Sequence, residues 1–74
     1  MDWNKIVGAN VRRLRVELKL TQEQLAHDAE IDVTYLRGIE AGRRNPSIAV
    51  LGRVAAVLGC QPALLLDGSL DVLI

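Results

Sequence analysis

Cys60 and His27 carry the side chains in this sequence that most often serve in nucleophilic or acid–base catalysis. The chain has one residue of each type, and the two lie far apart in the sequence. We expect His27 to be exposed on a helix and Cys60 to act as a small hydrophobic residue after the apolar end of another helix. Asp67 and Asp71 near the C-terminus do not form a convincing carboxylate pair. The sequence therefore predicts that the protein is not an enzyme.

Cofactor and metal sites have no better support in the sequence. There is no glycine-rich loop that could hold a phosphate, and no cluster of metal-ligating residues. A single cysteine can form neither an internal disulfide nor a zinc site. We expect no cofactor, no metal and no small-molecule ligand.

Charge and length restrict the remaining classes of function. The 74-residue chain has nine basic and nine acidic side chains and no net charge, so it is not a general polycation. Residues 1–45 contain eight of the basic side chains and seven of the acidic ones, so any basic surface must be a local stripe. No apolar run approaches the ~20 residues of a membrane span, and the N-terminus lacks a signal-peptide core. These features predict one small cytoplasmic domain without a membrane segment.

Hydrophobic periodicity and capping residues predict an all-α fold. Half of the residues are hydrophobic but only Trp3 and Tyr35 are aromatic, so the core must be aliphatic. Thr21 and Gln24 have the spacing of a capping box, and apolar residues recur at three- and four-residue steps. The five expected helices span residues 3–19, 21–29, 33–41, 48–58 and 62–66. We expect a compact domain over residues 1–68 and a short apolar tail over residues 69–74.

The segment from Thr21 to Glu40 is the most informative part of the chain. Two short helices are joined by a turn of about three residues, with the small Ala26 where the helices must approach each other. Ile31 can plug the turn. This spacing is typical of a helix-turn-helix, whose second helix projects its N-terminal residues from the domain. Spacing alone leaves open the alternative of an ordinary helical bundle.

Over residues 6–66 the sequence resembles the XRE-type, lambda-repressor-like helix-turn-helix domains. The motifs that carry this resemblance are Val11-Arg12-x-Leu14-Arg15, Leu20-Thr21-Gln22-Glu23-x-Leu25-Ala26, Ile31-Asp32-x-Thr34-Tyr35-Leu36, Ile39-Glu40-x-Gly42-x-Arg44-x-Pro46-Ser47 and Leu51-x-x-Val54-Ala55-x-x-Leu58-Gly59. The run from Asp32 to Glu40 is also similar to the small controller proteins of restriction–modification systems. The resemblance implies a compact five-helix, sequence-specific transcription regulator that binds double-stranded DNA with its third helix in the major groove. We expect such a regulator to act as a homodimer on a pseudo-palindromic operator, occupying a promoter and either blocking or recruiting RNA polymerase.

The resemblance also indicates which residues contact DNA. Val33, Thr34 and Arg37 lie on the face of the third helix away from its apolar residues and are the expected base contacts. For Val33 the alternative is packing beneath the turn. The expected contacts to the DNA backbone are Gln22, Arg12, Tyr35, Arg43, Arg44 and Asn45. The alternatives are half-buried packing for Tyr35 and a solvated position for the others.

Two further positions are expected to be structural, and two depart from the family pattern. The family pairs Arg15 and Glu40 as a partly buried ion pair between the first and third helices. Glu30 stands where the family usually has glycine or asparagine, so a left-handed backbone there would cost roughly 1 kcal/mol. Gly38 lies inside the third helix, and its missing side chain leaves room for close approach of either DNA or a partner subunit.

The C-terminal segment from residue 62 is too apolar for a domain of this size to cover completely. We expect it to form the homodimer contact, with help from Val50 or Val57, which would place two recognition helices ~34 Å apart. The expected interface residues are Leu64, Leu65, Leu70, Val72, Leu73 and Ile74. The alternative is that the tail folds back over its own helices. An antitoxin-like module that binds another protein through this segment is the alternative function.

Overall fold

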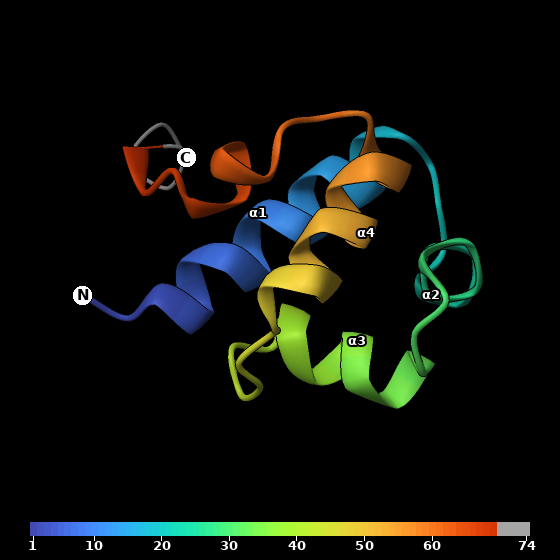
Figure 1. The fold of residues 1–74 in the computed structure, drawn as a ribbon, viewed down its shortest axis with the longest axis horizontal. Coiled ribbons are helices and arrows are strands. Elements are labelled where there is room, and N and C mark those ends of the chain that lie inside the picture. Colours follow the sequence, from blue (N-terminus) through green and yellow to red (C-terminus); the bar gives the residue numbers. More distant parts are fainter. Residues whose placement is uncertain (70–74) are drawn as a thin grey trace.

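The computed structural model describes residues 1–69, and their fold is all-α (Figure 1). Within these residues four α-helices are followed by one 3₁₀ helix, and there is no strand. The elements are α1 (Trp3–Glu17), α2 (Gln22–Ala29), α3 (Val33–Glu40), α4 (Ile48–Leu58) and η1 (Pro62–Leu66). The all-α prediction is confirmed, while the prediction of a fifth α-helix is wrong. None of the described helices has the length and apolarity needed to cross a bilayer.

The capping residues define where the α-helices begin. Asp2 accepts a hydrogen bond from the backbone N–H of Lys5 at 3.2 Å, and Ser47 accepts one from Val50 at 3.1 Å. The capping box at α2 is complete, because Thr21 Oγ1 accepts from Gln24 N at 3.0 Å and Gln24 Oε1 accepts from Thr21 N at 2.7 Å. These caps satisfy N–H groups that have no partner within the helix.

The core is aliphatic and lies between α1, α2, α3 and α4, with η1 closing one end. Its largest fully buried apolar side chains are those of Leu25, Leu36, Ile39 and Leu65, each at most 1% exposed. Ile31 is half-buried against this cluster, as expected for a plug in the turn. Figure 1 shows α2 at the right of the molecule and α3 below α4, and α1 packs mainly against α3 while α4 packs mainly against α2. Each helix of the α2–α3 pair is therefore supported by one of the other two α-helices.

One buried amide explains the shape of η1. Asn10 of α1 is completely buried, and its Nδ2 donates to the carbonyl oxygens of Leu65 at 2.9 Å, Asp67 at 3.1 Å and Leu64 at 3.4 Å. Pro62 begins the element, and its backbone bonds have 3₁₀ spacing, such as Asp67 N to Leu64 O at 3.2 Å. The element is only five residues long, and the carbonyl oxygens of its last residues accept hydrogen bonds from Asn10. The segment therefore forms a short 3₁₀ helix in place of an α-helix.

Candidate nucleic-acid interface

The turn between α2 and α3 has the geometry that a helix-turn-helix requires. Glu30 ends α2 in the left-handed conformation, with φ 59° and ψ 44°. The backbone N–H of Ile31 then donates to the carbonyl of Ala26 at 2.9 Å, and Asp32 caps α3 by accepting from Thr34 N at 2.7 Å. Glutamate thus takes the left-handed position that glycine or asparagine usually occupies in the family, and the turn keeps its shape.

The N-terminal part of α3 presents two of the three expected base-contact residues to solvent. Thr34 and Arg37 are exposed, whereas Val33 is half-buried and packs against the core. Arg37 does not extend freely into solvent: its Nη2 donates to Glu23 Oε2 at 3.1 Å and its Nε to Gln22 Oε1 at 3.3 Å. Sequence reasoning did not identify Glu23 as a partner of this arginine.

Gln22 connects the exposed face of α3 to a buried ion pair. Its Oε1 accepts from Arg37, and its Nε2 donates to Glu40 Oε1 at 3.1 Å. The side chain is half-buried at the first position of α2, immediately after the Thr21 cap. Gln22 therefore stands at the N-terminus of a helix, where the helix dipole favours an anion, with its amide already held by two charged neighbours.

The expected ion pair between Arg15 and Glu40 is present. Arg15 Nε donates to Glu40 Oε2 at 2.7 Å and Arg15 Nη2 to Glu40 Oε1 at 3.0 Å, so the pair is bidentate. Arg15 Nη1 also donates to the carbonyl of Leu20 at 2.8 Å. The side chains are 13% and 4% exposed. The hydrogen bond to Glu40 raises the pKa of the Arg15 guanidinium further above its ordinary value. This pair joins α1, the α1–α2 turn and the end of α3.

The loop after α3 brings three more expected contact residues close to that helix. Arg43, Arg44 and Asn45 are all exposed. The Arg44 guanidinium carbon lies 5.4 Å from the centre of the Tyr35 ring, within the range of a cation–π contact. The Tyr35 hydroxyl donates to the carbonyl of Asn45 at 3.5 Å, and the ring is half-buried.

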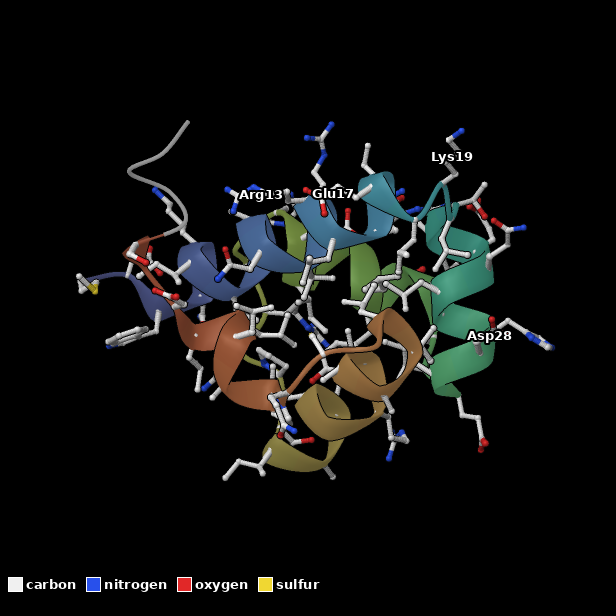
Figure 2. All side chains as sticks on the ribbon, turned by 90° about the horizontal axis from the view of Figure 1, so that it is seen from above. Arg13, Glu17, Lys19 and Asp28 are labelled. Carbon is white, nitrogen blue, oxygen red and sulfur yellow. The ribbon has the colours of Figure 1, made fainter. Side chains whose placement is uncertain are left out.

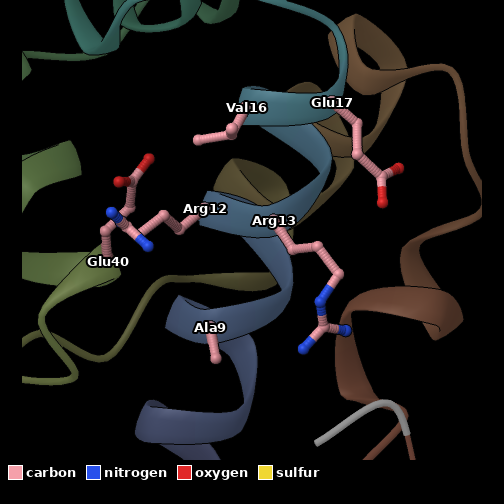
Figure 3. A pocket seen from close by; sticks show the side chains of 6 residues that line it. All are labelled: Ala9, Arg12, Arg13, Val16, Glu17 and Glu40. Atoms are coloured by element: carbon pink, nitrogen blue, oxygen red, sulfur yellow. The ribbon is translucent and has the colours of Figure 1, made fainter. Parts of the chain in front are cut away.

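Arg12 lies on α1, apart from the α3 face. It is exposed and lines an open hollow between α1 and the end of α3. Figure 3 shows the Arg12 side chain directed toward Glu40, while Arg13 points to the other side of α1. Charged residues of both signs, among them Arg13, Glu17, Lys19 and Asp28, are spread over the outer surface of α1, the following turn and α2 (Figure 2). In the loop after α3, by contrast, the two exposed arginines Arg43 and Arg44 are adjacent to each other.

The residues expected at a dimer contact divide into three groups. Leu64 is half-buried, whereas Leu65 has no exposed surface and Val50 is 8% exposed. The prediction for Leu65 is wrong, because η1 packs against α1 and α4 with this side chain directed into the core. Leu66 lies in the segment expected to form the contact but was not among the residues named for it, and it is the exposed leucine of η1. Leu70, Val72, Leu73 and Ile74 lie outside the described residues.

His27 and Cys60 occupy the kinds of position expected for them. His27 is exposed on α2 beside Asp28, and Cys60 is partly buried after α4. Burial raises the pKa of the Cys60 thiol, which favours the unreactive protonated form. Among residues 1–69 no group of histidine, cysteine and acidic residues is arranged to hold a metal ion.

Comparison with known proteins agrees with this geometry. A helix-turn-helix family profile matches residues 11–65. The chain is 44% identical over 59 residues to y4dJ, an uncharacterized HTH-type transcriptional regulator from Sinorhizobium fredii, covering 80% of this chain and 77% of that protein. The structure of the restriction–modification controller protein C.AhdI from Aeromonas hydrophila is 34% identical, with a TM-score of 0.81 over 84% of this chain and 94% of that one. SinR, a master regulator for biofilm formation solved in complex with DNA, is 35% identical, with a TM-score of 0.79 over 82% and 98%. The chain belongs to the XRE-type helix-turn-helix family.

Proposed function

We propose that the protein is a sequence-specific DNA-binding transcription regulator that inserts the N-terminal part of α3 into the major groove. The observation that carries this proposal is a small hollow lined by Thr34, Tyr35, Gly38, Arg43 and Arg44. A polar side chain able to hydrogen-bond a base edge there lies beside two exposed arginines able to bind phosphate. The three relatives are all regulators, which favours this function over the antitoxin-like alternative.

The contacts proposed for α3 read the bases. Thr34 hydrogen-bonds a base edge, and Arg37 reaches a guanine or a phosphate once its guanidinium leaves Glu23. Val33 contributes only the part of its side chain that the core leaves exposed, against a thymine methyl group. These contacts carry the sequence preference of the complex.

The proposed contacts to the DNA backbone surround that helix and fix its orientation. Phosphates bind at the N-terminus of α2 and at the loop after α3. Both places adjoin α3, because Gln22 bonds to Arg37 and the loop arginines line a hollow with Thr34. Arg12 on α1 is the most distant of them. The proposed backbone contacts are Gln22, Arg12, Tyr35, Arg43, Arg44 and Asn45.

The proposed complex contains a homodimer of the chain. Two copies would present their α3 helices about 34 Å apart, matching the half-sites of a pseudo-palindrome. The contact surface we propose includes Leu64 and Leu66 together with residues 70 and 72–74. Leu65 is left out of it because its side chain is buried in the core. A restriction–modification controller is the specific role that C.AhdI suggests for such a small regulator. A cytoplasmic location is part of this proposal.

The test is fluorescence anisotropy with a duplex from upstream of the protein's own gene and a shuffled duplex, at two salt concentrations. A preference of roughly a thousandfold for the native duplex is expected for a specific regulator. Thr34→Ala should weaken binding to the native duplex by ~1–3 kcal/mol while Arg43→Ala weakens both duplexes alike. Equal, weak binding of the unaltered protein to both duplexes would refute the proposed function. Sedimentation of Leu66→Glu against a Gln61→Glu control tests the dimer surface, and an unchanged mass for Leu66→Glu would exclude that residue from it.

A further inference from the structure

Gly38 lies in the middle of α3 and has no side chain, and the space that a side chain would take is occupied by Arg44. A Cβ atom built at Gly38 would lie 2.3 Å from Cγ of Arg44 and 3.4 Å from both Cβ and Cδ of the same side chain. The stem of Arg44 therefore lies directly on the backbone of α3. The space that the sequence left for DNA or for a partner subunit is filled by an arginine of the same chain.

The loop after α3 is tied to the same glycine through its backbone. The N–H groups of Arg43 and Arg44 both donate to the carbonyl oxygen of Gly38, at 2.9 Å and 3.2 Å. This folds the loop back along the helix and brings the Arg44 side chain across it. Position 38 thus determines both where the loop begins and where this side chain can lie.

The far end of Arg44 is held by Tyr35, one helical turn before Gly38. Its guanidinium lies over the Tyr35 ring at 5.4 Å, and the Tyr35 hydroxyl donates to the Asn45 carbonyl at 3.5 Å. Tyr35 is in turn half-buried against the core, so its position is set by the fold. A long and exposed side chain is in this way supported at two points along its length.

We propose that Gly38 is a positioning residue for DNA binding, acting through Arg44. Because Gly38 has no side chain, Arg44 can lie flat against α3, which holds its guanidinium beside the exposed Thr34 and Arg43. The side chain is thereby preorganised in one rotamer for contact with a DNA phosphate. The inference rests on the proposed function, and adds to it which residue sets the geometry of a phosphate contact.

Helix propensity makes this proposal testable. Glycine weakens a helix interior relative to alanine, so Gly38→Ala removes that disadvantage for α3. It also forces the flexible Arg44 side chain to another rotamer, which the fold can accommodate because Arg44 is exposed. Gly38→Ala should therefore keep or raise the melting temperature while it weakens DNA binding. A residue with a merely structural role would change both properties in the same direction.

Gly52 provides a matched control inside α4. A Cβ atom at this position would have nothing within 4 Å, so Gly52→Ala changes helix propensity without moving a neighbour. We expect Gly52→Ala to raise the melting temperature by a few degrees and to bind DNA like the unaltered protein.

The measurement is anisotropy with a short random-sequence duplex between about 50 and 200 mM salt, where phosphate contacts dominate binding. Gly38→Ala should weaken binding roughly three- to tenfold and lower the slope of log K against log salt by about 0.9, as for the loss of one phosphate contact. Arg44→Ala should do the same. The double variant Gly38→Ala/Arg44→Ala should match Arg44→Ala alone, because Gly38 acts only through that side chain.

The outcomes separate this inference from the proposed function. If the unaltered protein shows no salt-dependent binding to DNA, the proposed function fails. If it binds and Gly38→Ala binds equally well, or if the effects of Gly38→Ala and Arg44→Ala add in full, the inference alone is overturned. Nuclear magnetic resonance tests the geometry without DNA, since the Tyr35 ring should shift the Arg44 side-chain protons in the unaltered protein and less so in Gly38→Ala. Identical Arg44 shifts in the two proteins would also overturn it.

Discussion

Replacing Arg15 with methionine tests the ion pair that joins α1 to the end of α3. The substitution keeps much of the apolar stem of the side chain and removes the guanidinium. Glu40 then loses the donors at 2.7 and 3.0 Å and keeps only Gln22 at 3.1 Å. Because the Glu40 side chain is only 4% exposed, water cannot replace the lost donors well. The variant leaves a carboxylate in the interior with one hydrogen bond.

The expected loss of stability follows from this burial. Removing one partner of a buried pair costs about 3–5 kcal/mol, and the remaining bond from Gln22 places Arg15→Met near 3 kcal/mol. Glu40→Gln should cost less, about 1.5–2.5 kcal/mol, because Arg15 is the more exposed partner and keeps the Leu20 carbonyl. In a domain of this size about 3 kcal/mol corresponds to a fall in melting temperature of roughly 12–24 °C.

The assay is urea unfolding followed by far-ultraviolet circular dichroism at low temperature, with both single variants and the double variant Arg15→Met/Glu40→Gln. The double variant should lose less stability than Arg15→Met alone, because it leaves no charge in the interior. If the free energy of unfolding of the single variants lies within about 0.5 kcal/mol of that of the unaltered protein, the range usual for surface sites, the reasoning is refuted. A double variant whose loss equals the sum of the single losses would show that the two residues do not act as a pair.

Three further predictions concern other contacts of the fold. Asn10→Leu should destabilise the protein by about 1–3 kcal/mol in urea unfolding, because the carbonyls of residues 64, 65 and 67 lose their donor; an unchanged midpoint would show that this amide does not hold η1. Glu23→Gln should change stability by less than about 1 kcal/mol, since its pair with Arg37 is exposed, yet strengthen DNA binding several-fold by releasing that arginine. The gain should shrink in an Arg37→Ala background, and an equal gain there would contradict the release of Arg37. Burial raises the pKa of Cys60 above its unfolded value, so its contribution to stability is present below about pH 8.5 and falls as the pH rises through the folded pKa. Urea unfolding against pH should show that fall for the unaltered protein and not for Cys60→Ser, and parallel curves would contradict it.

Features that depend on neighbours in the chain could be predicted from the sequence. The capping box of Thr21 and Gln24 and the caps at Asp32 and Ser47 join residues two or three positions apart, so their spacing is enough to identify them. Periodicity also placed the apolar faces of α1 and α4. The pairing of Arg15 with Glu40 came from the resemblance to a family, because these residues are too far apart in sequence for any local pattern to join them.

Contacts between distant segments required the tertiary structure. Leu65 was expected on the surface, but its burial depends on η1 packing against α1 and α4, which no local spacing encodes. Asn10 is the single polar residue among the buried residues of α1, and its place on the apolar face of the helix was a signal that could have pointed to such a contact. Its partner carbonyls are 54 to 57 positions away, so their identity could not be read from it.

The same distinction applies to the candidate interface. By itself the sequence determined that Thr34 and Arg37 would lie on the face of α3 away from its apolar residues, since the faces of a short helix follow from its period. Only the tertiary structure decided that Glu23 holds Arg37 and that Arg44 fills the space left by Gly38. These contacts depend on the relative position of two elements in the fold, and the side-chain types and spacing along one element do not specify that position.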